Sequence, residues 1–473
     1  MKLFYRLVIV GICCWLAGCA STPEPVDDVD AEALVDEVEA EEGGDWSIER
    51  PVDRQAQWVL EMVNERGGEF SEEEMDERFS DLIHQAMTYE QFSLAMTQVA
   101  STMAPFEVIE VYDRPSDEAL LLSVRGADGQ RYTMVVAVEN EDPHKMTGVQ
   151  FQPAPVDDED LATSWEEIES SLQGIGEERQ LLAARIDDGI CTPVFEVDTD
   201  KTLALGSTFK LYVLAALVEA VTRGDIDYDQ MVAIEEAHKS LPSGILQDEE
   251  VGSEHSVFEM AKLMISISDN TATDHLIALL GRQVVEEQIA ALGHRTPERN
   301  SPFLFTHEMM KLKVALGDSE RDEFVAMASD ERREYLDSEL VAMDLPAVDD
   351  AMDWHKPRHI DSIEWFASAD ELCSLFAYFS QGADSDEEGF EKGLEAMAEN
   401  DGGMNLGEKA NYVGFKGGSE PGVLNLSWLI EGEDGGWYVV VVGANDTDEA
   451  IEMNELHALG RAAGRLVLQA DDQ

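Results

Sequence analysis

The pattern of apolar and polar positions divides the chain into two segments that each predict a folded unit. In the first segment, apolar residues recur at helical spacing around Trp58, and Ser71 with Glu74 forms a capping box that opens a second helix. Four strand-like runs follow, over residues 106–112, 119–124, 132–138 and 146–151. Helices followed by an antiparallel meander predict a small α+β domain over residues 46–153.

The second segment predicts one antiparallel sheet built from both of its ends. After a linker rich in proline and aspartate, Ser164 and Glu167 form another capping box. Runs 181–186 and 190–197 flank Asp187-Asp188-Gly189, and runs 423–430 and 437–442 form a second hairpin near the C-terminus. Helical patterns lie between the two hairpins. We therefore expect an α+β domain over residues 164–473, with the sheet covered by helices.

The N-terminus predicts an export signal. A basic start precedes the apolar run 7–16 and then Leu16-Ala17-Gly18-Cys19, and this run is too short for a transmembrane helix. The last four residues resemble a bacterial lipobox. That resemblance marks residues 1–19 as a lipoprotein signal and implies cleavage before Cys19, lipidation of the Cys19 thiol and a membrane partner through the lipid. Ala20 at the next position favours the periplasmic face of the outer membrane. Residues 20–45 contain no Lys or Arg and predict a disordered acidic stalk.

Charge and cysteine content narrow the range of functions. The chain carries 100 acidic and 32 basic residues, a formal charge of −68, which excludes nucleic acid as a partner and suits a high-salt habitat. Of the five cysteines, only Cys191 and Cys373 lie beyond the lipobox. They form either one disulfide or two buried thiols, and the sequence leaves both alternatives open.

The first candidate for chemistry is Ser207-Thr208-Phe209-Lys210, where an extended stretch gives way to a helix. Residues three apart share a helix face, so the Lys210 amine can reach the Ser207 hydroxyl. The helix N-terminus offers free N–H groups to an oxyanion. The amine acts as a base only if its pKa falls, which burial and a neighbouring cation together can achieve.

Two further motifs complete the set. Ser268-Asp269-Asn270 lies between two helical runs, where a loop can aim a hydroxyl and an amide into a cleft. Lys416-Gly417-Gly418-Ser419 precedes the last hairpin; its glycines let a substrate approach the strand, and its lysine supplies positive charge. Taken singly, the first of these motifs is better explained as a helix cap, and the second as a glycine turn with a surface lysine.

Together the three motifs resemble the Ser-x-x-Lys, Ser-Asp-Asn and Lys-Thr-Gly set of class A β-lactamases and penicillin-binding proteins. The resemblance implies Ser207 as the acylated nucleophile, Lys210 as its base and Ser268 as a proton relay. It implies substrate binding by Asn270, Lys416, Gly418 and Ser419, with the N–H groups of Ser207 and Ser419 as the oxyanion hole. No cofactor or metal is implied.

Residues 415–423 and the two-domain layout also resemble a narrower group, the clavulanic-acid-cluster esterase and its mycobacterial lipoprotein relatives. Members pair an isomerase-like N-terminal domain with a β-lactamase-like one. The small domain predicted here has a nuclear-transport-factor-like or cystatin-like shape, which matches that layout.

The chain departs from the class A pattern in ways that affect the expected reaction. It has no Glu-x-x-Leu-Asn motif to position a hydrolytic water, and Glu308 and Glu364 are only weak substitutes. Gly417 replaces the threonine whose hydroxyl helps to bind a β-lactam carboxylate. His355 and His359 suggest a metal pair, but Pro357 between them disfavours the helix that would align their rings.

The sequence thus favours a serine hydrolase that acts on a small ester or β-lactam and deacylates slowly. Two alternatives stay open. One is a D-alanyl-D-alanine peptidase acting on peptidoglycan peptides, and the other is a non-catalytic binding lipoprotein. The oligomeric state is not predicted.

Overall fold

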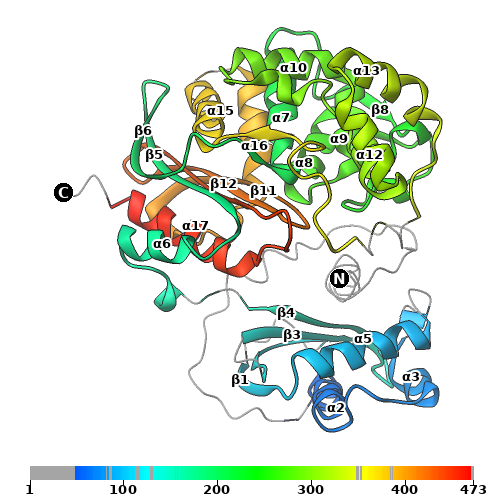
Figure 1. Cartoon of the computed structure of the whole chain (residues 1–473). Helices are drawn as coiled ribbons and strands as arrows, with labels where there is room; N and C mark the ends of the chain where they lie inside the picture. Colours follow the sequence, from blue (N-terminus) through cyan, green and yellow to red (C-terminus); the bar gives the residue numbers. More distant parts are fainter. Residues whose placement is uncertain are drawn as a thin grey trace. The chain divides into compact units, whose positions relative to one another are not determined.

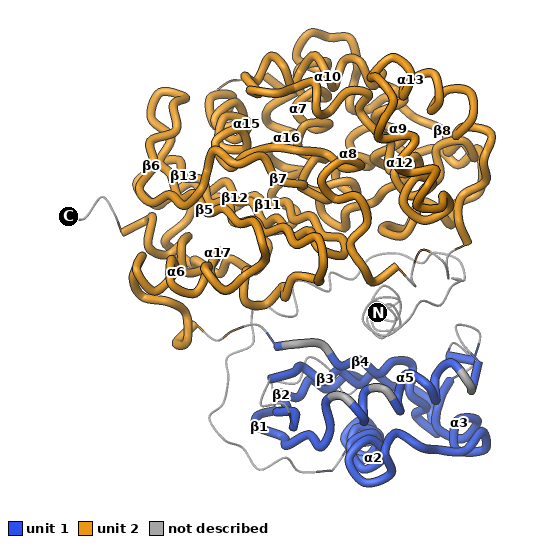
Figure 2. Tube along the Cα trace, viewed as in Figure 1, with its two compact units in different colours: residues 1–155 blue, residues 156–473 orange. Residues whose placement is uncertain are grey.

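The computed structural model describes residues 48–469, apart from residues 49, 81–82, 85–87, 112–117, 128–130, 155, 157, 348–350, 352–353, 384 and 386. The chain divides into two compact units, residues 1–155 and 156–473 (Figure 2). The predicted signal peptide, Cys19 and the acidic stalk all lie outside the described residues. None of the helices in the described ranges is long and apolar enough to cross a bilayer.

Unit 1 places its helices before its strands. The helices are α2 (Pro51–Glu65), α3 (Glu72–Arg78) and α5 (Tyr89–Thr102). The strands β1 (Glu107–Val111), β2 (Ala119–Arg125), β3 (Arg131–Val138) and β4 (Met146–Pro153) form one antiparallel sheet in that order. The Ser71 hydroxyl accepts the Glu74 N–H at the start of α3, as its capping box predicts. The α+β order predicted for this unit is confirmed.

Unit 2 is built on a five-stranded antiparallel sheet with the order β11-β12-β13-β5-β6. Its strands are β11 (Ala410–Glu420), β12 (Val423–Gly432), β13 (Trp437–Asn445), β5 (Glu178–Asp187) and β6 (Ile190–Val197). The sheet therefore joins the two predicted hairpins through β13 and β5, and β11 is an edge strand. Asp188 and Gly189 both have positive φ at the β5–β6 turn, as a tight two-residue hairpin requires.

Helices cover both faces of this sheet (Figure 1). On one face lie α6 (Trp165–Leu172) and α17 (Met453–Val467), and on the other lie α7 (Lys210–Thr222), α8 (Val257–Ser266), α15 (Ala369–Gly382) and α16 (Glu388–Ala398). Side chains alternate between the two cores along β13. Val439 and Val441 join the core under α7, whereas Val440 and Val442 join the core under α17.

The remaining helices and short strands of unit 2 surround the core on the α7 side. They are β7 (Leu203–Ala204), β8 (Met231–Ala233), β9 (Glu254–Ser256), α9 (Asn270–Leu280), α10 (Arg282–Ala291), α11 (Thr306–Met310), α12 (Asp318–Ala326), α13 (Ser329–Ser338) and β10 (Phe366–Ala367). Shorter turns include a 3-10 turn at Gly206–Phe209 and a π-helical turn at Lys311–Ala315.

A disulfide joins Cys191 on β6 to Cys373 on α15. It ties the edge strand opposite β11 to a helix that packs on the sheet. The sequence left a disulfide and two free thiols open, and the structure contains the disulfide.

Candidate active site

Ser207 lies in the 3-10 turn between β7 and α7. Gly206 precedes it with φ +52°, a conformation that glycine adopts without strain. Side chains at positions i and i+3 of a 3-10 turn are eclipsed, so Ser207 and Lys210 lie on one side of the chain. Ser207 is half-buried, whereas Lys210, the first residue of α7, is fully buried. The predicted change from extended chain to helix at this motif is what the structure has.

The Lys210 amine connects the first motif with the second. Its Nζ donates to the Ser268 carbonyl at 2.6 Å, to Ser268 Oγ at 2.9 Å and to Asn270 Oδ1 at 2.7 Å. The expected direct hydrogen bond from Ser207 to the amine is not among those of the described residues. The structure therefore brings Lys210, Ser268 and Asn270 into contact, with Ser207 on the adjacent turn.

Burial lowers the pKa of Lys210 well below its usual range, and the positive charge of Lys416 lowers it further. Asp269 and Asp274 act in the opposite direction through their negative charge. Burial also lowers the pKa of Lys416 to about 7, and its Nζ donates to the Gly417 carbonyl at 2.6 Å. A neutral Lys210 amine is the state that can accept a proton from a hydroxyl.

The loop that carries Ser268 is fixed by Asp269. Ser268 has φ +59°, which is unusual for a residue with a side chain, and it lies between α8 and α9. One carboxylate oxygen of Asp269 accepts the Ala272 N–H at 2.7 Å and caps α9. The other accepts the N–H groups of Ile245 and Leu246 at 2.7 and 3.0 Å. The buried Asp269 carboxylate thus joins the start of α9 to residues 245 and 246. These bonds fix the loop and hold the neighbouring Ser268 in its unusual backbone conformation.

Both polar groups of the Asn270 side chain are used inside the protein. Its Oδ1 accepts from Lys210, and its Nδ2 donates to the Leu241 carbonyl at 2.7 Å. The resemblance implies that Asn270 binds substrate. In this structure its amide oxygen accepts from the Lys210 amine, and its substrate-binding role stays a prediction.

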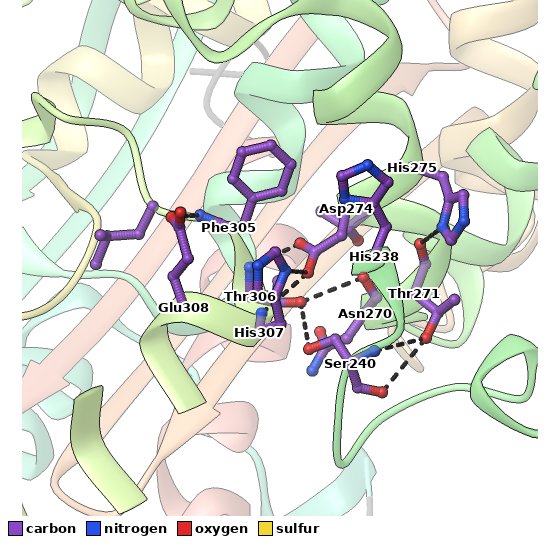
Figure 3. Close-up of polar contacts among 12 residues, drawn as sticks. His238, Ser240, Asn270, Thr271, Asp274, His275, Phe305, Thr306, His307 and Glu308 are labelled. Atoms are coloured by element: carbon purple, nitrogen blue, oxygen red, sulfur yellow. Dashed lines mark hydrogen bonds and ion pairs between the residues drawn. The ribbon is translucent and has the colours of Figure 1, made fainter. Parts of the chain in front are cut away.

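A second layer of polar residues supports α9 and the loop ahead of α11 (Figure 3). Asp274 is fully buried and accepts the N–H groups of Thr306 and His307 at 2.7 and 2.9 Å, as well as His307 Nδ1 at 2.8 Å. The Thr306 hydroxyl donates to Ser240 Oγ at 2.7 Å. None of these residues was predicted from the sequence as part of the site. Asp274 lies one helical turn after Asn270, and that spacing was the only local signal for it.

The third motif lies on edge strand β11, pressed against the serine turn. A Cβ at Gly418 would lie 2.1 Å from the Leu205 carbonyl oxygen and 2.5 Å from the Ser207 nitrogen. A Cβ at Gly206 would lie 2.7 Å from the Ser419 nitrogen. Both positions therefore need glycine, because the two backbones touch. This contact brings the backbone nitrogens of Ser207 and Ser419 close together, while the Ser419 side chain is exposed.

The two carboxylates considered for water activation are engaged elsewhere. Glu308 caps α11 through the Phe305 N–H at 2.9 Å and accepts two hydrogen bonds from Arg282 at 2.7 and 3.1 Å. Glu364 is buried against Lys313, at 3.4 Å. Their contacts within the described chain are therefore structural.

The histidine pair does not form a metal site in the structure. His355 is exposed, and His359 Nε2 lies 3.8 Å from Asp322 Oδ1. Across the residues that are described, no group of three or more His, Cys, Asp or Glu side chains is placed to hold a metal ion.

Comparison with known proteins supports the resemblance seen in the three motifs. Residues 164–470 match the model described as the beta-lactamase enzyme family. Residues 48–143 match a separate model, described as the N-terminal part of an ORF 12 gene product, which is consistent with a small additional domain. No curated protein matches this chain.

Several solved structures are similar to this chain over about two thirds of its length. A beta-lactamase from Sphaerobacter thermophilus is 21% identical, with 65% of this chain and 97% of that chain covered and a TM-score of 0.45. A beta-lactamase from Chitinophaga pinensis is 16% identical, with 65% and 98% covered and a TM-score of 0.45. A PBP-A mutant in an acyl-enzyme complex with penicillin G is 18% identical, with 65% and 95% covered and a TM-score of 0.45.

Proposed function

Since the chain belongs to the beta-lactamase enzyme family, we propose that it is a serine hydrolase that forms an acyl-enzyme on Ser207. The strongest support for this proposal comes from the state of Lys210. A fully buried lysine with a strongly lowered pKa starts the helix next to Ser207, and the Ser-Asp-Asn loop holds its amine. Burial alone lowers the pKa of any lysine, but here the uncharged amine also lies on the turn beside a serine hydroxyl, where a general base requires it.

The geometry supports the following acylation step. The neutral Lys210 amine takes the Ser207 proton as Oγ bonds to the substrate carbonyl carbon, and the carbonyl π electrons move to its oxygen. The backbone N–H groups of Ser207 and Ser419 donate to that oxyanion. As the carbonyl re-forms, the bond to the leaving group breaks. The proton then passes from Lys210 through the Ser268 hydroxyl, 2.9 Å away, to the leaving group.

The contacts of Lys210 also show what must change for this step. An ammonium has three N–H donors, and all three have acceptors on Ser268 and Asn270. A neutral amine has two donors and one lone pair. Loss of the proton therefore releases one of these three contacts, and in the proposed step the amine turns the lone pair from Ser268 or Asn270 toward the Ser207 hydroxyl on the adjacent turn.

We further propose that deacylation is slow and that the substrate is an ester or a strained amide. Asp269, Asp274 and Glu308 each accept several structural hydrogen bonds, and among the described residues none forms a hydrogen bond or ion pair with Ser207 or Lys210. Activation of a hydrolytic water then depends on Lys210 itself. Gly417 offers no hydroxyl for a β-lactam carboxylate, which favours an ester over a penicillin as the faster substrate.

Acylation mass tests the proposal directly. The protein is incubated with an activated ester or a fluorescent penicillin, and intact mass is measured over time. We expect wild type to gain one acyl group and Ser207→Ala to gain none. Ser374→Ala is a matched control because Ser374 is an exposed serine on α15, and it should label like wild type. Equal labelling of Ser207→Ala and wild type refutes the assignment.

We also propose that the protein is a lipoprotein tethered through Cys19. The support is the sequence pattern alone, since residues 1–47 are not described. Radiolabelled palmitate should be incorporated into wild type during expression in a bacterium and not into Cys19→Ser. Label in both variants would disprove the anchor.

A further inference from the structure

A buried group of charges lies next to the proposed oxyanion site and has no part in the acylation step above. Lys313 comes from the π-helical turn, Glu364 precedes β10, and Glu420 ends β11. The Lys313 side chain is 0% exposed, that of Glu364 is 0% exposed and that of Glu420 is 5% exposed. Lys313 Nζ forms ion pairs with both carboxylates. We call these residues the 313–364–420 cluster.

One arm of the cluster leads to the chain just before the nucleophile. The second oxygen of Glu364 accepts the Trp365 N–H at 2.9 Å, and the Trp365 carbonyl accepts the Leu205 N–H at 2.9 Å. The indole of Trp365 stacks on Phe209 with ring centroids 3.7 Å apart. Glu364 is therefore connected, through two hydrogen bonds, to the residue two positions before Ser207.

The other arm leads to the second oxyanion donor. Glu420 follows Ser419 directly on β11. The Ser419 nitrogen is the atom that a Cβ at Gly206 would approach to 2.7 Å. Movement of Glu420 therefore moves the end of the strand that supplies this N–H group.

We propose that the 313–364–420 cluster positions the oxyanion site by holding the Ser419 N–H in register with the Ser207 turn. Lys313 links the end of β11 to the segment that pairs with residues 203–205. These residues are positioning residues, because none of them lies among the groups that contact the substrate carbonyl in the proposed reaction. This inference rests on the proposed acyl-enzyme.

The charge state of the cluster suggests which substitution preserves it. Burial raises the pKa of Glu420 well above its usual range; the Lys313 charge opposes this shift and the Glu364 charge adds to it. Two buried carboxylates share one ammonium, so a neutral Glu420 leaves a balanced Lys313–Glu364 pair. Glutamine has the shape of a neutral carboxyl group and keeps one acceptor oxygen for Lys313. Leucine keeps the volume and removes the contact.

The test compares acylation rate constants with substrate affinity in the full-length protein. Stopped-flow acylation by an activated ester at increasing concentrations separates the limiting rate constant from the half-saturation concentration. A small displacement of an oxyanion donor costs on the order of tenfold to a hundredfold in rate. We expect Glu420→Leu to lose that factor in the limiting rate constant with half-saturation unchanged, and Glu420→Gln to stay within about threefold of wild type.

A control separates positioning from loss of stability. Arg461 on α17 is 5% exposed and forms an ion pair with Asp158, and it touches none of the three motifs among the described residues. Arg461→Met should lower the thermal midpoint as Glu420→Leu does but leave the acylation rate constant within about threefold of wild type. An equal loss of rate in Arg461→Met would overturn the inference, because any destabilisation would then suffice. Glu420→Gln being as slow as Glu420→Leu would overturn it too.

Glu364→Gln gives an independent result if Glu420→Leu does not fold. Lys313 and the Trp365 N–H donate to different oxygens of Glu364, so in glutamine one of these two donors faces the NH2 group, which cannot accept. We expect at least a tenfold loss of the acylation rate constant, and a wild-type rate in this variant overturns the inference. A wild type that is never acylated overturns the proposed function and this inference with it, whereas normal acylation of folded Glu420→Leu overturns this inference alone.

Discussion

The charge of Lys416 should make the preference for anionic substrates depend on pH near neutrality. Lys416 is 4% exposed, and burial lowers its pKa to about 7. A substrate carboxylate needs the protonated form of this lysine. Because the pKa is lowered into the neutral range, that form is present below pH 7 and is lost as the pH rises through 7. A lysine with an ordinary pKa would stay charged to about pH 10.

The size of the effect follows from the fraction protonated. About half of Lys416 is charged at pH 7 and about one-eleventh at pH 8, so the charged population falls roughly fivefold over that step. The second-order acylation rate constant reports the free enzyme, in which this pKa applies. For a penicillin or another carboxylate-bearing substrate, we expect that constant to fall about fivefold from pH 7 to 8 and about tenfold more from pH 8 to 9.

A neutral ester provides the matched measurement. It needs no charge at Lys416, and burial, the larger cause of the lowered Lys210 pKa, does not change with pH. The rate constant for the ester should therefore not fall between pH 7 and 9, because deprotonation of the Lys210 base can only raise it. Both rate constants are measured by stopped flow in one buffer series at constant ionic strength. Their ratio then reports the effect of the Lys416 charge alone.

Lys416→Arg tests the assignment because guanidinium stays charged throughout this range. If the variant binds the anionic substrate, its rate constant should lose the fall above pH 7. A ratio of anionic to neutral rate constants that does not change between pH 7 and 9 in wild type would refute the reasoning. So would an unchanged fall in Lys416→Arg.

Three further predictions follow from the contacts of unit 2. Lys210→Met should lower the acylation rate constant by about 10²- to 10⁴-fold, the usual contribution of a general base, and stopped-flow rates near wild type would exclude that role. Gly418→Ala should cost about 1–3 kcal/mol in urea unfolding and also slow acylation, because its Cβ would meet the Leu205 carbonyl oxygen at 2.1 Å; an unchanged midpoint contradicts the close contact. Cys191→Ser with Cys373→Ser should cost about 2–5 kcal/mol in the same assay yet leave acylation rates unchanged, and slower acylation would show that the disulfide also shapes the site.

The sequence predicted those parts of the fold whose signals are local. Each hairpin has its own turn and alternating strands, so β5 and β6 could be placed around Asp187-Asp188-Gly189. The observed β6 has the predicted bounds, and β5 is four residues longer than its predicted run of residues 181–186. The Ser207 turn was recognisable because extended chain, motif and helix follow one another within a few residues. The disulfide was left open because 182 residues separate its cysteines, and no local pattern records such a distance.

Only the residues within the three motifs were predicted from the sequence as members of the site. Lys313 and Glu420 are 107 residues apart, and each looks like an ordinary surface charge in the sequence. Glu364 was noticed, but as a candidate for water activation; its burial against Lys313 and its bond to the Trp365 N–H could not be inferred without the fold. Long-range ion pairs leave no periodicity, so this part of the site became visible only in three dimensions.

The buried lysines are a better guide to the position of the candidate active site than the excess of acidic residues. The formal charge of −68 offers every cation many exposed partners, so nothing on the surface drives a lysine into the interior. Burying an ammonium costs several kcal/mol unless it is paired or loses its proton. Lys313 is compensated by two glutamates, whereas Lys210 and Lys416 respond with lowered pKa values. Lys210 follows Ser207, Lys416 lies on the strand beside it, and Lys313 is linked to the same turn through Glu364 and Trp365. A fourth buried lysine, Lys311, donates to the Leu340 carbonyl, so burial by itself does not identify a site, and it is the connection of the other three to the Ser207 turn that supports the proposed reaction.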